Sequence, residues 1–135
     1  MGDGRGGLYS FDALDRLFGY LSAPSATTVL PQFQGLAPGD VIPIGRGPDW
    51  PVAVVAPDEA LVVVPVESGV SWCWALVPDG AGTRLLSRVR VRVGSRALLA
   101  ALGPAVDLPW LVMEREMLRG IRRRAEASHG GAGPG

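Results

Sequence analysis

The segment 83–93 constrains the fold more than any other part of the sequence, because it alternates between two kinds of side chain. One face carries Leu85, Ser87, Val89, Val91 and Val93. The other face carries Arg84, Arg88, Arg90 and Arg92. Since successive side chains of a strand point to opposite sides of a sheet, this pattern predicts a strand with one wet face. The apolar face must then be buried against a second layer.

Four earlier segments have the composition of short strands bounded by Pro, Gly or Asp. They are residues 41–44, 52–56, 60–66 and 71–77. Two turn signals separate consecutive segments, AlaProAspGlu at 56–59 and AspGlyAlaGly at 79–82. The order of strands and turns predicts an antiparallel meander, in a sheet of five to six strands.

The second layer is expected to be a helix that begins at the end of the strand region. From Trp110 onward one helical stripe is apolar: Trp110, Met113, Met117 and Ile121, flanked by Leu118. The arginines point away from that stripe: Arg115, Arg119, Arg122 and Arg123. Pro104 and Pro109 are expected to interrupt the helical residues before it, which places the boundary at Asp107 or Leu108. We therefore predict an α+β fold in which Gly120 permits a close approach to the sheet.

The N-terminal third is predicted to contain one short helix and a long irregular connection. Residues 12–20 have helical spacing of apolar side chains, with Asp12 as the N-cap. Residues 22–39 are rich in Ser, Thr, Pro and Gly, and Leu30, Phe33 and Leu36 are expected to tuck inward from them. We predict one domain over residues 1–126, followed by a disordered Gly-rich tail over 127–135.

Composition argues against several classes of function. Thirteen basic residues balance thirteen acidic ones, so no net charge draws the 135-residue chain toward nucleic acid or an anionic membrane. Cys73 is the single cysteine, which excludes an internal disulfide and a cysteine-based zinc site. No signal-peptide pattern or membrane-length apolar run occurs. We expect a cytoplasmic protein without a cofactor, a metal site, a nucleic-acid partner or a membrane span.

Four stretches, in the same order, resemble the bacterial SRPBCC proteins, the START/polyketide-cyclase-like superfamily. They read GRGGLYSFDALDRLFG at 4–19, LPQFQGLAPGDVIP at 30–43, WALVPDGAGTRL at 74–85 and MEREMLRGIRRRAE at 113–126. The resemblance implies a helix-grip fold, a curved antiparallel sheet wrapped on a long C-terminal helix around an apolar cavity. Members of that superfamily carry an edge strand and helices before the first stretch. The chain is therefore expected to be N-terminally truncated, and we expect either a homodimer that covers the exposed sheet edge or poor solubility.

Candidate ligand-binding residues follow from the predicted faces. Trp72 and Trp74 share one face of their strand, and hydrophobicity favours that face as the inner one. Trp110, Met113 and Met117 would then face them from the helix. Three polar or partly polar residues complete the predicted site: Tyr9, Ser87 and Glu114. The competing interpretation is that the Met and Trp side chains only fill a core.

The predicted function is binding of a small hydrophobic ligand between the sheet and the C-terminal helix. Catalysis requires paired acid and base groups, and the candidates are isolated in sequence: Tyr9, Asp12, Glu67, Asp107 and Glu114. No catalytic residue is assigned, although Glu114 beside the apolar stripe is the best candidate for a buried acid. Two alternatives stay open: an enzyme of the polyketide cyclase or aromatase type, and a ligand-free interaction protein or truncated fragment.

Overall fold

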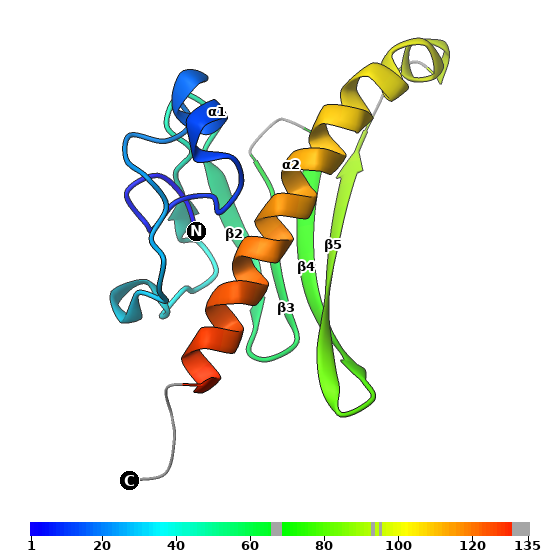
Figure 1. The fold of residues 1–135 in the computed structure, drawn as a ribbon. Helices are drawn as coiled ribbons and strands as arrows, with labels where there is room; N and C mark the ends of the chain where they lie inside the picture. The colour runs from blue at the N-terminus through cyan, green and yellow to red at the C-terminus, as the bar shows by residue number, and fades with distance from the viewer. Residues whose placement is uncertain (66–68, 93, 95, 131–135) are drawn as a thin grey trace, which may run out of the picture.

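The computed structural model describes residues 1–65, 69–92, 94 and 96–130 (Figure 1). Its sheet is formed by β1 (Val41–Ile42), β2 (Trp50–Ala56), β3 (Ala60–Val63), β4 (Val70–Asp79) and β5 (Gly82–Val91). Its helices are α1 (Asp12–Leu17), the single 3-10 turn η1 (Pro31–Phe33) and α2 (Arg96–Gly130). The strands are antiparallel and lie in the sheet in chain order, so the predicted α+β meander is confirmed. Val66 and Val93, predicted as strand ends, lie outside the described residues.

The β4–β5 hairpin determines which side of the sheet faces the helix. Trp72 of β4 pairs with Val89 of β5, and Trp74 pairs with Ser87, so these four side chains share one face. Both tryptophans point toward α2, as predicted, and Trp74 is only 7% exposed. The arginines of β5 lie exposed on the opposite face, as the alternation of side chains predicts.

The core lies between that inner face and α2. Its buried members are Ile42, Trp50, Val52, Val63, Trp74 and Met117. Met117 is the contribution of α2 and is 3% exposed, while Leu118 and Ile121 pack against the same cluster. The predicted apolar stripe of the C-terminal helix therefore lies on the sheet, and Figure 1 shows α2 crossing the sheet obliquely.

Three local predictions about helices are wrong. Asp12 is the first residue of α1 and not its N-cap, which is Phe11 without a side-chain capping bond. The prolines do not end the helix, since α2 runs through Pro104 and Pro109 from Arg96. A proline removes one backbone hydrogen bond and bends a helix that neighbouring turns still hold, and Figure 1 shows the axis of α2 turning near its N-terminal end. The helix also extends to Gly130, so residues 127–130 are not part of a disordered tail.

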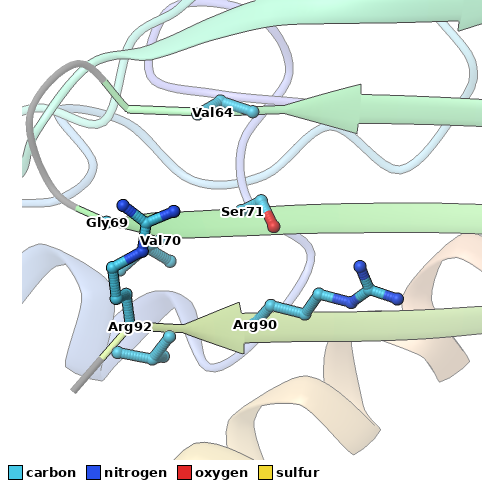
Figure 2. Close-up of a pocket in the computed structure, with 7 residues that line it drawn as sticks. Val64, Gly69, Val70, Ser71, Arg90 and Arg92 are labelled. Carbon is cyan, nitrogen blue, oxygen red and sulfur yellow. The ribbon is translucent and has the colours of Figure 1, made fainter.

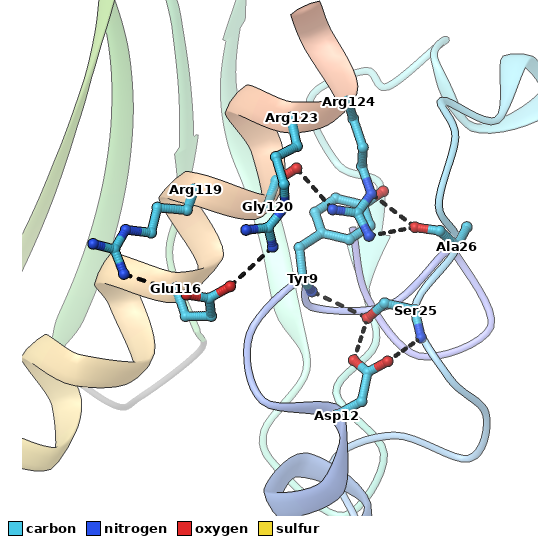
Figure 3. Close-up of polar contacts among 9 residues, drawn as sticks. All are labelled: Tyr9, Asp12, Ser25, Ala26, Glu116, Arg119, Gly120, Arg123 and Arg124. Carbon is cyan, nitrogen blue, oxygen red and sulfur yellow. Dashed lines mark hydrogen bonds and ion pairs between the residues drawn. The ribbon is translucent and has the colours of Figure 1, made fainter. Parts of the chain in front are cut away.

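Arg124 of α2 fastens the N-terminal segment to the helix (Figure 3). Its Nε donates a hydrogen bond of 2.7 Å to the Ala26 carbonyl, which also accepts one from Nη2, and its Nη1 donates to the Gly120 carbonyl at 2.7 Å. The guanidinium lies 4.0 Å from the centre of the Tyr9 ring, a cation–π contact. We call these contacts the Arg124 clamp.

Asp12 and Ser25 hold the segment that the Arg124 clamp engages. The backbone N–H and the hydroxyl of Ser25 donate to the Asp12 carboxylate at 2.7 and 2.6 Å, and the Tyr9 N–H donates to the Ser25 hydroxyl at 3.2 Å. Asp12 therefore ties the start of α1 to the connection that follows the helix (Figure 3). Leu30, Phe33 and Leu36 of that connection are half-buried, which agrees with the predicted inward placement.

Gly120 allows a close approach, but to the N-terminal segment and not to the sheet as predicted. A Cβ atom at this position would lie 2.6 Å from the Tyr9 carbonyl oxygen and 2.9 Å from the Tyr9 Cβ. Those distances are too short for a carbon atom, and the backbone oxygen cannot rotate away. The helix and the Tyr9 backbone can therefore meet here only because residue 120 has no side chain.

Three exposed arginines of α2 form ion pairs along the helix surface. Glu116 receives Arg123 at 2.9 Å and Arg119 at 3.7 Å, and Arg122 pairs with Glu126 at 2.8 Å (Figure 3 shows the first two). The hydrogen bond from Arg123 lowers the pKa of Glu116 below its ordinary value. Such solvated pairs contribute little stability. Arg124 differs from these three arginines, because it is half-buried and binds the N-terminal segment.

Replacing Gly120 with Ala is expected to destabilise the protein by about 1–3 kcal/mol, because the added methyl group overpacks the contact with Tyr9. Intrinsic helix propensity acts in the opposite direction, since Ala is favoured over Gly by about 1 kcal/mol in a helix. The free energy of unfolding in urea, followed by circular dichroism, measures the sum. The control is Ala127→Gly at an exposed position of α2, which should show propensity alone. A Gly120→Ala protein more stable than wild type would contradict the close approach.

Candidate functional site

The hollows of the described structure include two of similar volume. The first, of about 530 Å³, lies at the ends of β3, β4 and β5 and is lined by residues such as Val64, Ser71 and Arg90 (Figure 2). It borders positions 66–68 and 93, which lie outside the described residues. Because its walls are described only in part, we assign no site to it.

The second hollow lies between the inner face of the sheet, α2 and the N-terminal segment, and we call it the central cavity. Its volume is about 510 Å³, within the range of small-molecule pockets. β4 contributes Trp72 and Trp74, and α2 contributes Met113 and Met117. The N-terminal segment closes another side with residues such as Leu8 and Phe18. The Arg124 clamp therefore positions one wall of this cavity against the helix.

All four tryptophans of the chain line the central cavity. The Trp72 ring is at their centre, with its centroid 4.4 Å from that of Trp74, 5.4 Å from Trp50 and 5.3 Å from Trp110. These separations and the tilted or edge-on ring planes are those that aromatic pairs favour. The result is a rigid apolar wall contributed by β2, β4 and α2.

A chain of hydrogen bonds links the tryptophan wall to the helix. The indole Nε1 of Trp72 donates to the Ser87 hydroxyl at 2.8 Å, and that hydroxyl donates in turn to Oε1 of Glu114. A hydroxyl group can accept one bond while donating another, so Ser87 is suited to this bridging position. The chain fixes the orientation of the Trp72 ring and holds the half-buried Glu114 side chain at the cavity.

Asp15 is the most deeply buried polar residue of the described structure, with 0% of its surface exposed, and it lines the central cavity. The Ser10 hydroxyl donates a hydrogen bond to its Oδ2. Burial raises the pKa of the Asp15 carboxyl, the bond from Ser10 opposes this rise, and the nearby charge of Asp12 adds to it. The other oxygen, Oδ1, has no hydrogen-bond partner among the described residues.

Trp74 contains a second buried polar atom without a partner in the described residues. Its Nε1 is buried and has no partner in the described part of the chain, in contrast to the Nε1 of Trp72 two residues earlier. The described lining contains two carboxyl groups, from Asp15 and Glu114, and no arginine or histidine. The cavity is therefore apolar over most of its surface, with a few polar atoms at defined places.

The structure brings together most of the predicted site residues. Six of them line the central cavity: Trp72, Trp74, Trp110, Met113, Glu114 and Met117. Ser87 reaches the cavity indirectly, because it binds Trp72 and Glu114. Tyr9 lies elsewhere: its ring packs under Arg124 in the clamp, and it is not among the lining residues.

The sequence analysis missed Ser10, Asp15 and Trp50. Trp50 begins β2, two residues before the predicted start of that strand, and strand periodicity extended toward the N-terminus would have placed it on the inner face beside Val52. Asp15 and Ser10 carry no such signal, because an acid in a short amphipathic helix is normally solvated.

Within the described residues, no cluster of three or more His, Cys, Asp or Glu side chains is arranged to hold a metal ion. No described helix has the length and hydrophobicity needed to cross a bilayer.

The raised pKa of Asp15 predicts a pH-dependent contribution to stability. The folded protein holds the proton of the Asp15 carboxyl more tightly than the unfolded chain does. The stability that this proton contributes is therefore complete below pH about 4, the pKa in the unfolded chain, and is lost as pH rises through the raised pKa of the folded protein. The Asp15→Asn protein should lack this loss. Urea unfolding of both proteins between about pH 4 and pH 8 measures the difference. Asp49→Asn, at an exposed position, is the control and should follow wild type. A difference between Asp15→Asn and wild type that stays constant with pH would contradict the raised pKa.

Comparison of the chain with models of protein families, with curated proteins and with solved structures gives no match. The assignment to the SRPBCC superfamily therefore stays a prediction from the four sequence stretches. What the chain does must be inferred from the geometry of the central cavity.

Proposed function

We propose that the protein binds a small apolar molecule in the central cavity, in a helix-grip arrangement like that of the SRPBCC superfamily. The observation that carries the proposal is the open volume of about 510 Å³ behind a wall of four tryptophans. Protein cores are packed closely and contain few voids larger than a water molecule. An apolar hollow of this size is therefore better explained as a binding site than as a core.

The rim of the cavity supports the same proposal. Trp110 is 40% exposed although it lines the cavity, and Phe18 and Tyr20 are also exposed lining residues. Large apolar side chains gathered around an opening are typical of ligand sites, because leaving them in water is unfavourable. A ligand that enters between α1 and α2 would cover part of these rings. We assign no reaction to this site.

The rigid tryptophan wall and the flexible methionines suit an aromatic or alicyclic ligand. Trp72 is held by its bond to Ser87, so its ring gives a fixed flat surface. Met113 and Met117 face the cavity from α2, and methionine adapts its shape to the group it contacts. A flat ring of the ligand can therefore stack on the tryptophans on one side, while the methionines pack against its other side.

Binding of the neutral fluorescent probe N-phenyl-1-naphthylamine tests the proposal. Wild type should bind about one molecule with increased probe emission, and Trp110→Ala should weaken binding by about tenfold, equivalent to about 1.4 kcal/mol of lost ring contact. The control is Leu111→Ala, because Leu111 is the next residue of α2, is 62% exposed and does not line the cavity. Fluorescence titration gives both affinities. Absence of saturable binding to wild type, or equal weakening by the two substitutions, would refute the proposal.

A further inference from the structure

Glu114 places a carboxylate oxygen without a partner in the described residues at the central cavity. We infer that the ligand is an apolar organic cation, whose ammonium group binds Oε2 of Glu114 beside the Trp110 ring. The inference rests on the proposed function, and it adds the charge and the polar group of the ligand.

The two oxygens of the Glu114 carboxylate have different surroundings. Oε1 accepts the hydrogen bond from Ser87, which lies on the inner face of the sheet, so the carboxylate lies between α2 and the sheet. Oε2 has no hydrogen-bond partner among the described residues. The unpaired side-chain atoms that are sealed from solvent in the described structure are Oδ1 of Asp15 and Nε1 of Trp74, and Oε2 of Glu114 is not one of them. Because Glu114 lines the cavity, a ligand group can reach this oxygen.

The charge of Glu114 is not balanced by another side chain of the described residues. Glu116, two residues later on α2, pairs with Arg119 and Arg123. Glu114 forms no ion pair within the part of the chain that the structure describes. A charge at a half-buried position is screened less than one on the surface, so it favours a bound ion of opposite sign. A cationic group of the ligand would supply that partner.

Two other groups of the described lining can carry a charge near neutral pH, the Met1 amino group and the Asp15 carboxyl. Burial, and then the charge of Arg5, lower the pKa of the Met1 amino group, which favours its uncharged form. Burial raises the pKa of Asp15, which likewise favours its uncharged form. Neither group is paired with Glu114. The balance of charge in the cavity therefore favours a cation over an anion.

Trp110 offers the same cation an aromatic surface. It lies four residues before Glu114 on α2, and residues at this spacing are neighbours on one face of a helix. Its side chain is 40% exposed and lines the cavity, so a ligand can contact it. An ammonium group over the face of an indole is attracted by the ring electrons. Trp72 is held beside the same carboxylate through Ser87, and it gives the apolar part of the ligand a ring to stack on.

Equilibrium dialysis of the full chain with three probes that share one ring system tests the inference. 1-Naphthylmethylamine is a cation at neutral pH, 1-naphthalenemethanol is neutral, and 1-naphthoate is an anion. Hydrophobic burial alone favours the neutral probe, because a charge is costly to remove from water. We expect the cation to bind about fivefold more tightly than the neutral probe, because a hydrogen bond between charged groups and a cation–π contact exceed that cost. The anion should bind most weakly.

Glu114→Gln assigns the preference to this residue. The amide keeps an oxygen that can accept from Ser87, but the charge is removed. The affinities for the cation and the neutral probe should then differ by about twofold or less, because only the cation–π contact remains. The matched control is Glu126→Gln, which removes the same charge from an exposed position of α2 and should keep the wild-type ratio.

Circular dichroism checks that the Glu114→Gln protein folds. If it does not, Trp110→Leu gives an independent result, because this substitution removes the aromatic surface and keeps an apolar side chain at the cavity. The ratio of cation to neutral affinity should fall by about half in Trp110→Leu. An unchanged ratio in that variant would overturn the inference.

The probe series separates failure of this inference from failure of the proposed function. If no probe binds to wild type, both are refuted. If the neutral probe binds and the cation binds equally or more weakly, the inference is overturned and the binding function stays intact. Tightest binding of 1-naphthoate would also overturn it, because the Met1 amino group would then be the charged partner of the ligand. A cation preference that Glu114→Gln leaves unchanged would show that the charge is recognised elsewhere, which is equally contrary to the inference.

Discussion

Burial of one apolar stripe of α2 on one face of the sheet is the constraint on which the rest of the structure depends. The β5 arginines leave only the other face available for packing. Met117 fills the centre of that contact beside Trp74, and both are almost completely buried. With the helix held at this point, its more N-terminal turns carry Trp110 and Met113 over the sheet. The central cavity lies between these turns, the inner face of the sheet and the N-terminal segment.

The N-terminal segment completes the cavity through polar contacts and not through a second core. Arg124 binds the Ala26 carbonyl and covers the Tyr9 ring, and Gly120 lets the Tyr9 backbone reach the helix. These contacts hold the segment that continues into α1, where Asp15 lies. A clamp at one end of α2 therefore determines the position of a buried carboxyl group in the cavity.

The polar groups of the cavity fall into a paired set and an unpaired set. Trp72, Ser87 and Glu114 form a chain of two hydrogen bonds across β4, β5 and α2. Asp15 and Trp74 each keep one atom without a partner in the described residues. Paired groups fix the shape of a site, whereas a buried polar atom without a partner is costly to the folded state.

The sequence by itself determined the buried faces of the elements that have a regular side-chain pattern. The alternation in β5 and the stripe of α2 state which sides are buried, because both patterns are local and span many residues. Together with the turn signals they predicted the meander, and hydrophobicity then favoured the inward face for Trp72 and Trp74. Six of the residues predicted in this way line the central cavity. Only the tertiary structure decided the burial of Asp15, the place of Tyr9 in the clamp and the different pairing of Trp72 and Trp74. Each of these depends on single contacts between segments far apart in the chain, and a single contact leaves no period in the sequence.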